Sequence, residues 1–307
     1  MSKEMEKTSF IWMDGKLIPW DEAKMHVMSH VIHYGSGEFS GARCYQNPNG
    51  SAIFRLRDHA RRLIESCTIY GMEIPYTKED IAEAMVATVE ANKIPECYIR
   101  PILYRGYHSL GVDSRNCPVN MAIGILKWDK YIGDYADVCV SSWQRPAPNT
   151  FPAMAKSTAN YANSQLIKHE AGRLGLNEGI ALTVFGHISE GSGENIFVLY
   201  DGILRTPPLS DSVLNGIMRR TVLQLAKDLS EELKIEVREE SVPRELLYIA
   251  DEVFFTGSAA EITPIRKIDH VERIVPGPVT KRLQDEVFGI IRGEKEDRYH
   301  WLTYVKM

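Results

Sequence analysis

Apolar and polar residues alternate over short runs at the start of the chain, a pattern typical of β-strands. Two such runs, residues 10–13 and 16–20, flank the dipeptide Asp14-Gly15. Because this dipeptide tolerates positive φ, we predict a β-hairpin and antiparallel pairing from the first elements onward. Asp201-Gly202, later in the chain, predicts a second hairpin for the same reason.

The next segments combine a helical and a strand pattern. Residues 77–93 carry apolar side chains four positions apart behind a Thr-x-x-Asp cap, which predicts an amphipathic helix. Residues 97–104 alternate instead, so one face of a predicted strand carries Tyr98, Arg100, Ile102 and Tyr104. Pro101 on the opposite face lacks an N–H, which predicts an edge strand or a bulge.

The second half continues with short strands between helices. Helical patterns are predicted near 216–230, 243–249 and 278–292, and a further helix is predicted to end near Gly175. Because the strands are short and several are joined by hairpin turns, we predict an α+β fold with largely antiparallel sheets and flanking helices.

A polar stretch with one glycine, residues 131–137, predicts the connection between two domains. It separates a small N-terminal α+β domain, 1–130, from a large C-terminal α+β domain, 138–307. The chain has 307 residues, of which 44% are hydrophobic and 25% charged, so it can supply a sizeable core.

Charge and cysteine content exclude several classes of protein. A net charge of -5 does not indicate the basic surface that nucleic-acid binding needs. The sequence contains no run of about 18 apolar residues, so we predict no membrane-spanning helix. The five cysteines form no CxxC pair, which favours the reducing cytoplasm over a disulfide framework or a zinc site. His26, His30 and His33 have metal-like spacing without a matching acidic residue, so we interpret them as structural and predict no metal.

Lys156 is a candidate catalytic residue, because it follows a Pro-rich stretch and lies among small residues at the start of a predicted helix. A lysine that loses its proton through burial can attack a carbonyl and form a Schiff base. The small neighbours leave room for a bulky planar group. The alternative is an ordinary surface lysine, which the usual exposure of lysine favours when this residue is considered alone.

Glu190 and Glu194 flank glycines just before an apolar strand. Gly191 and Gly193 permit a close backbone approach to a ligand, and a buried carboxylate there could keep a pyridine nitrogen protonated. The alternative is a polar turn with two solvated glutamates.

Two further segments could bind an anion. Asn215-Gly216 precedes a helical pattern, so the amides of Ile217 and Met218 can face a phosphate. Ser258 lies in a turn of small residues after a strand, and its amide and hydroxyl could serve an anion, although an ordinary turn is the more common explanation of such a sequence.

Taken together, several motifs extend over essentially the whole chain. In order they are HYGSGEFSGARCY, RDHARRL, YIRP, SSWQRPAPNTFPAMAKSTANY, ISEGSGENIF, NGIMRRTV and GSAAEITPI. This series resembles the branched-chain amino acid aminotransferases, pyridoxal 5'-phosphate enzymes of fold type IV. The resemblance implies transamination between L-leucine, L-isoleucine or L-valine and 2-oxoglutarate, which gives branched 2-oxo acids and L-glutamate.

The resemblance also implies which residues bind the cofactor. Lys156 is expected to form the Schiff-base linkage and to move a proton between the substrate Cα and the cofactor. Tyr161 is expected to reach O3′ of the pyridine ring, and Glu190 to pair with the ring nitrogen. The residues expected around the phosphate are Arg62, Ile217, Met218 and Ser258.

The family pattern further implies a substrate pocket without fixed charge on its walls, which suits branched aliphatic side chains. The residues expected to line it are Tyr34, Phe39, Tyr98, Tyr131, Ser258 and Ala259. Arg100 is expected to meet the distal carboxylate of glutamate or 2-oxoglutarate. A homodimer or higher homo-oligomer is implied, with the loop near Gly111 and Val112 reaching the partner's site.

The chain departs from the family pattern at Glu38-Phe39-Ser40, where an apolar residue, Phe and Glu are usual. If this stretch is a strand, Glu38 and Ser40 face away from Phe39, and the substrate range is the property placed in question. Met218 replaces a common Thr but keeps its amide, and Ser258 keeps the hydroxyl of a common Thr.

Other interpretations stay open at this stage. Relatives of the same fold include D-amino acid and (R)-amine aminotransferases and aminodeoxychorismate lyase, and a binding protein without catalytic activity is a third class. The joint presence of Lys156, Tyr161, Glu190 and Arg62 argues against the last. The preferred branched-chain substrate does not follow from the sequence.

Overall fold

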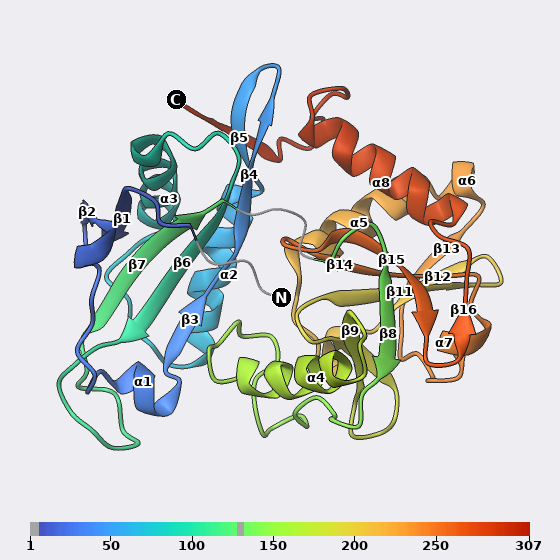
Figure 1. Ribbon diagram of the computed structural model, residues 1–307, viewed down its shortest axis with the longest axis horizontal. Helices are drawn as coiled ribbons and strands as arrows, with labels where there is room; N and C mark the ends of the chain where they lie inside the picture. Colours follow the sequence, from blue (N-terminus) through green and yellow to red (C-terminus); the bar gives the residue numbers. More distant parts are fainter. Residues whose placement is uncertain (1–5, 128–131) are drawn as a thin grey trace. The chain divides into compact units, whose positions relative to one another are not determined.

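The computed structural model describes residues 6–127 and 132–307. Contacts between Cα atoms divide the described chain into two compact units (Figure 1). The first comprises residues 6–127, 155–159 and 289–307, and the second comprises 132–154 and 160–288.

An eight-stranded sheet forms the centre of the first unit, and all of its pairs are antiparallel. The order is β17-β5-β4-β6-β7-β1-β2, and β3 pairs with β6. The strands are β1 (Phe10–Met13), β2 (Lys16–Pro19), β3 (Gly37–Phe39), β4 (Ala42–Asn47), β5 (Gly50–Phe54), β6 (Cys97–Arg105), β7 (Val119–Leu126) and β17 (Leu302–Val305). The predicted hairpin is confirmed, since β1 pairs with β2 and both Asp14 and Gly15 have positive φ.

Two helices supply most of the apolar side chains that pack against this sheet. Helix α2 (Leu56–Ile69) and helix α3 (Lys78–Asn92) bury residues such as Leu63 and Met85 against β4, β6 and β7. Helix α3 begins with the predicted cap, in which Thr77 Oγ1 accepts from the Asp80 amide at 3.1 Å. The shorter helical elements of this unit are η1 (Trp20–Glu22) and α1 (His30–Tyr34).

Strand β6 lies inside the sheet, so the edge strand predicted from Pro101 is wrong. Pro101 pairs with Ile123 of β7, and its carbonyl accepts from the Ser40 amide at 3.0 Å on the other side. Ser40 lies between the end of β3 and the start of β4. The missing N–H of Pro101 therefore faces a break between two short strands, where the ladder needs no donor.

The second unit contains a mixed nine-stranded sheet in the order β10-β9-β8-β15-β14-β11-β12-β13, with β16 paired to β15. Three pairs are parallel: β8 with β9, β8 with β15, and β12 with β13. The strands are β8 (Ala136–Val140), β9 (Glu178–Leu182), β10 (Ile188–Gly191), β11 (Asn195–Tyr200), β12 (Ile203–Thr206), β13 (Glu236–Glu239), β14 (Glu252–Gly257), β15 (Glu261–Ile268) and β16 (Val271–Glu272).

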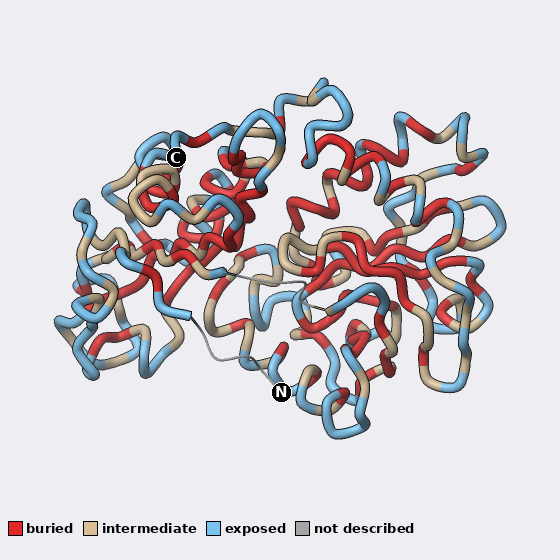
Figure 2. The backbone as a smooth tube through the Cα atoms, turned by 45° about the horizontal axis from the view of Figure 1, so that its top comes forward, coloured by how far each residue is buried: buried red, intermediate tan, exposed pale blue. Residues whose placement is uncertain are grey.

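Helices accompany this second sheet, close to where the apolar periodicity predicts them. They are α4 (Tyr161–Arg173), η2 (Leu209–Asp211), α5 (Ile217–Asp228), α6 (Ser230–Leu233), α7 (Leu246–Ile249) and α8 (Pro278–Ile291). Figure 2 shows buried backbone along the central strands and exposed backbone at the turns. The predicted α+β class with largely antiparallel sheets is confirmed.

The two units differ from the predicted domain division in two segments. Residues 155–159 group with the first unit because Ser157 pairs with Glu38 of β3. The C-terminal residues also group there, because β17 pairs with β5. Part of the predicted connection, 131–137, is strand, since β8 begins at Ala136, while residue 131 lies outside the described residues.

The packing of the first unit makes a direct prediction about stability. Leu103 of β6 is fully buried against α2 and α3, so Leu103→Ala should lower the free energy of unfolding by about 3 kcal/mol through lost burial and a residual cavity. Chemical denaturation monitored by fluorescence measures this loss. Leu174→Ala, at a site that is 62% exposed, is the control, and an equal loss in both variants would contradict the assignment.

Candidate active site

Lys156 lies on a short segment that extends the first sheet beside β3. The Phe39 amide donates to the Lys156 carbonyl at 3.0 Å, and the Thr158 amide donates to the Gly37 carbonyl at 2.8 Å. This register places Lys156 opposite Phe39, and the lysine Nζ lies 4.9 Å from the centre of the phenyl ring. Lys156 is half-buried, which does not fit a fully solvated surface lysine.

The same face of the sheet carries three of the predicted substrate residues. The Arg100 guanidinium lies 4.9 Å from the Phe39 ring centre and 5.2 Å from that of Tyr98. Arg100 Nη2 also donates to the Tyr98 hydroxyl at 3.3 Å. A Cβ at Gly41 would overlap that hydroxyl, so glycine is required for Tyr98 to lie here. Arg100 is thus held by two rings and a hydroxyl on the face that carries Lys156.

Arg62 approaches this region from α2. Its side chain is buried, and Nη2 donates to Ser40 Oγ at 3.2 Å, while Ser40 Oγ lies 3.0 Å from His59 Nδ1. One turn further along α2, Ser66 Oγ accepts from the Lys156 amide at 3.0 Å. The helix therefore both places a guanidinium and fixes the backbone of the lysine.

In the second unit, three donors hold the Glu190 carboxylate. Arg145 Nη2 lies 2.9 Å from one carboxylate oxygen, and both side chains are less than a tenth exposed. The other oxygen accepts from Asn195 Nδ2 at 2.9 Å and from the Leu214 amide at 3.0 Å. The buried guanidinium pairs with the carboxylate, and the three donors together give it one orientation.

Glu194 has a different environment. Burial, followed by the negative charge of Glu178, raises the pKa of its carboxyl to about 8. It accepts a hydrogen bond from the Gly193 amide at 3.1 Å. Of the two glutamates in the Gly-rich stretch, Glu190 is therefore the one held beside a buried guanidinium.

The start of α5 adds backbone donors to the second unit. Gly216 is its N-cap and has no side-chain cap, so the amides of Ile217 and Met218 have no acceptor within the helix. A Cβ at Gly216 would overlap Asn195 Oδ1, so Asn195 contacts both the helix start and the Glu190 carboxylate. The arrangement presents positive partial charge to an anion.

The remaining predicted residues lie in several elements. Tyr161 is the first residue of α4, and Ser258 and Ala259 form the half-buried turn between β14 and β15. Tyr34 is exposed on α1, where its ring stacks on His30 with 4.5 Å between ring centres. Tyr131 lies outside the described residues.

Three side chains of this arrangement were missed in the sequence. Arg145 and Asn195 lie inside quoted motifs, but nothing local indicates that both contact Glu190. Ser66 was missed as well, because its contact with the Lys156 amide depends on packing between distant segments. The one signal available in the sequence was that Ser66 is a polar residue on an otherwise apolar face of the helix.

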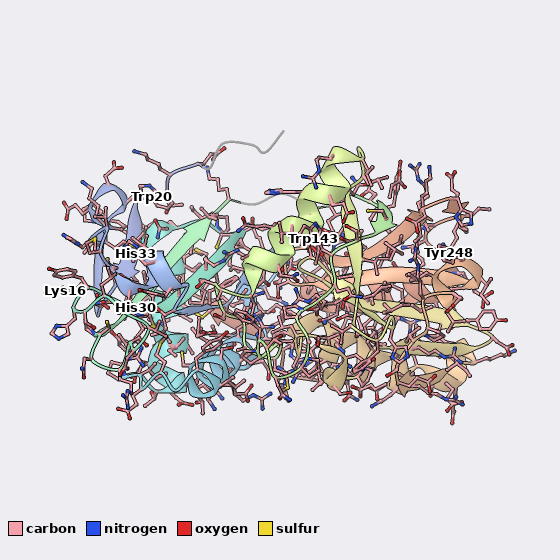
Figure 3. The ribbon with its side chains drawn as sticks, turned by 90° about the horizontal axis from the view of Figure 1, so that it is seen from below. Lys16, Trp20, His30, His33, Trp143 and Tyr248 are labelled. Carbon is pink, nitrogen blue, oxygen red and sulfur yellow. The ribbon has the colours of Figure 1, made fainter. Side chains whose placement is uncertain are left out.

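Each of the three histidines near α1 is bonded to protein atoms. Figure 3 labels two of them, His30 and His33, on α1. His30 Nδ1 and Nε2 lie 2.7 Å from Ser36 Oγ and from the Gly111 carbonyl, and His33 Nε2 lies 3.0 Å from the Val27 carbonyl. His26 Nδ1 accepts from the Met28 amide. In the described part of the chain, no three His, Cys, Asp or Glu side chains are grouped as metal ligands would be.

Comparison with known proteins identifies the class to which this fold belongs. Residues 41–268 match the family model described as amino-transferase class IV, so the chain belongs to the class IV aminotransferases. A branched-chain-amino-acid aminotransferase of Escherichia coli K12 is 44% identical over 98% of both chains.

Solved structures give the same result. The crystal structure of the Escherichia coli branched-chain amino acid aminotransferase matches with a TM-score of 0.94 and 44% identity, and covers 98% of this chain and 100% of its own. The T.th. branched-chain amino acid aminotransferase complexed with N-(5'-phosphopyridoxyl)-L-glutamate matches with a TM-score of 0.92 and 39% identity, over 98% of this chain and 99% of its own.

The ion pair between Arg145 and Glu190 leads to a prediction that can be tested without a ligand. Arg145→Ala should lower the free energy of unfolding by roughly 3 kcal/mol or more, because it leaves a buried carboxylate without its cation. Thermal or chemical unfolding of the protein without cofactor measures this. The double variant with Glu190→Gln should lose less than the sum of the single losses, and strict additivity would rule out the coupling.

Proposed function

We propose that this chain is a pyridoxal 5'-phosphate enzyme that transfers the amino group of L-leucine, L-isoleucine or L-valine to 2-oxoglutarate. The observation that carries the proposal is the half-buried Lys156 opposite Phe39, on the face that also holds Arg100. The names of the relatives support the reaction, and the phosphopyridoxyl-glutamate in the T.th. enzyme structure supports the cofactor and the glutamate side of the reaction.

The residues of this chain fit the proposed cofactor by charge and donor type. Lys156 would hold it covalently, Glu190 would pair with the ring nitrogen, and Tyr161 with O3′. When bound, the pyridine ring supplies an electron sink for the bond that breaks at the substrate Cα. The groups proposed to bind the cofactor's phosphate are the Arg62 guanidinium, the Ile217 and Met218 amides and the Ser258 turn.

Each side chain has a task that its environment supports. The Lys156 amine accepts and returns the proton at the substrate Cα, and its backbone is fixed by Ser66 and β3. Arg100 binds the distal carboxylate of glutamate or 2-oxoglutarate by a charged fork. Phe39 and Tyr98 would contact branched side chains, and Tyr34, Tyr131 and Ala259 are proposed for the same pocket on the resemblance alone.

We also propose that the chain works as a homodimer. Apolar side chains lie exposed on two neighbouring segments of the first unit: Val27, Ile32 and Tyr34 around α1, and Tyr107, Leu110 and Val112 in the loop between β6 and β7. The segments are joined by His30 bonded to Gly111 and by His26 against Tyr107. A second copy covering this surface would bury it.

We infer a cytoplasmic location from the cysteines, since all five are free and buried, as in proteins kept in a reducing compartment. In the parts of the chain that the structure describes, no helix has both the length and the apolar character needed to cross a bilayer.

Replacement of the lysine tests the proposed chemistry. Lys156→Ala should lose transamination by at least about a thousandfold, because the covalent link and the proton carrier are both removed. Borohydride reduction of the wild type should leave pyridoxyl on the peptide that contains Lys156. A label on another lysine would refute the assignment.

A substrate panel separates the proposed reaction from its relatives. With 2-oxoglutarate fixed, L-leucine should be turned over faster than D-alanine or an (R)-arylethylamine, because Arg100 and the aromatic walls suit an alternation of glutamate and aliphatic substrates. Preference for the D-amino acid or the amine would move the chain to another activity of the same fold.

The proposed dimer is tested by charging its apolar surface. Val112→Asp, at a side chain that is 88% exposed, should convert the dimer to a monomer in analytical ultracentrifugation, because a carboxylate would be buried without a partner. Phe185→Asp, at an exposed position of the second unit, is the matched control. A wild-type monomer would end the proposal.

A further inference from the structure

A buried carboxyl lies directly behind the lysine. Because side chains alternate along a strand, the pairing that sets Lys156 opposite Phe39 also sets Ser157 opposite Glu38 on the other face. The flanking hydrogen bonds belong to the neighbouring residues, so Glu38 and Ser157 form the closer type of antiparallel pair. Their side chains therefore lie next to each other.

This second face belongs to the core of the first unit. Glu38 pairs with Leu103 of β6, a fully buried residue that packs against α2 and α3. Glu38 itself has no exposed surface. Within residues 6–127 and 132–307, neither carboxyl oxygen of Glu38 has a partner with full hydrogen-bond geometry, and the same is true of the Ser157 hydroxyl.

The titratable groups around Glu38 do not stabilise a negative charge. Burial raises the pKa of Glu38 to about 8, and the Ser157 hydroxyl lowers it only in part. Burial raises the pKa values of Cys67 and Tyr70, from α2 and its C-terminus, and the Glu38 charge adds to the shift in both. A hydrogen bond with the Ser157 hydroxyl lowers the pKa of Tyr70 in part. Arg105 is nearby but donates to the backbone carbonyls of Cys117 and Gly71.

A neutral carboxylic acid can donate and accept at once, and so can a hydroxyl. Glu38 in this form can bond to Ser157 without an unpaired charge in the core. Ser157 is the residue after Lys156, so a bond between Glu38 and Ser157 fixes the segment from behind, while Phe39 contacts the amine from the front.

We propose that Glu38 is a positioning residue, which acts as a neutral acid on Ser157 and thereby fixes the backbone that carries Lys156. The inference rests on the proposed role of Lys156 in binding the cofactor. Ionisation of Glu38 at alkaline pH would place an unpaired charge in the core and loosen this segment. The family pattern has an apolar residue at position 38, so the device belongs to this chain.

The first test uses the protein without cofactor and follows its thermal unfolding temperature from pH 5 to 9. The pKa of Glu38 is higher in the folded protein than in the unfolded chain, so the wild type should lose stability as pH rises from about 4.5 to about 8. Glu38→Gln cannot titrate and should lack this contribution. The difference between Gln variant and wild type should therefore grow through this window and level off above it.

The matched control is Thr88→Val, which alters a fully buried hydroxyl of α3 that bonds to the Ala84 carbonyl. Its unfolding temperature should shift by the same amount at every pH. If Glu38→Gln also shows a constant shift, Glu38 does not carry a titrating proton and the proposal is wrong.

The second test uses the enzyme loaded with pyridoxal 5'-phosphate. Glu38→Val removes the carboxyl beside Ser157 and leaves Tyr70 as a neighbour of the hydroxyl. We therefore expect kcat to fall on the order of tenfold with KM little changed, and the pH midpoint of the visible absorbance to shift. Glu38→Gln should restore both properties. Val and Gln variants that both match the wild type would overturn the positioning role.

The two tests also separate this inference from the proposed function. If the wild type shows no lysine-bound chromophore, the proposed function is wrong. The pH dependence of unfolding of the protein without cofactor would still test the role of Glu38. A normal wild-type chromophore with no effect of Glu38→Val would remove only the inference. If the Val variant does not fold, the pH dependence of the Gln variant decides.

Discussion

Two backbone hydrogen bonds, which join residues 156–158 to β3, are the constraint on which the arrangement in the first unit depends. They add a segment from far along the sequence to the sheet, and they set its register. Because a shift by one residue would exchange the two faces, this register decides that Lys156, and not Ser157, lies on the face of Arg100. The Ser66 hydroxyl adds a third bond that holds the same segment from α2.

Three buried glutamates of the chain, Glu38, Glu190 and Glu194, have different surroundings. Glu190 has a guanidinium and two further donors, which favour the carboxylate. Glu38 and Glu194 have no buried guanidinium paired in this way, and burial raises the pKa of both to about 8. A single type of side chain therefore pairs with a buried guanidinium in one place and has a raised pKa in two others.

Local signals predicted the fold well where the structure depends on neighbours in sequence. The turn at Asp14-Gly15, the capped helix α3 and the two faces of β6 all follow from the type and spacing of nearby residues. The position of Pro101 inside the sheet could not be predicted, because it depends on where β3 and β4 end. The contacts of Arg145 and Ser66 join segments that only the folded chain brings together.

The departure at positions 38 and 40 can be understood from the same alternation. The side chains at both positions face α2. The family pattern has its acidic residue at position 40 and this chain has it at position 38, so the carboxyl changes place on the face opposite Phe39, and the Phe39 face is unaltered. At position 40 a serine hydroxyl now accepts from Arg62 at 3.2 Å. A hydroxyl, unlike a carboxylate, orients the guanidinium without adding a negative charge beside it. The carboxyl at position 38, in contrast, is fully buried beside Ser157, where burial raises its pKa, and it does not compete for the arginine.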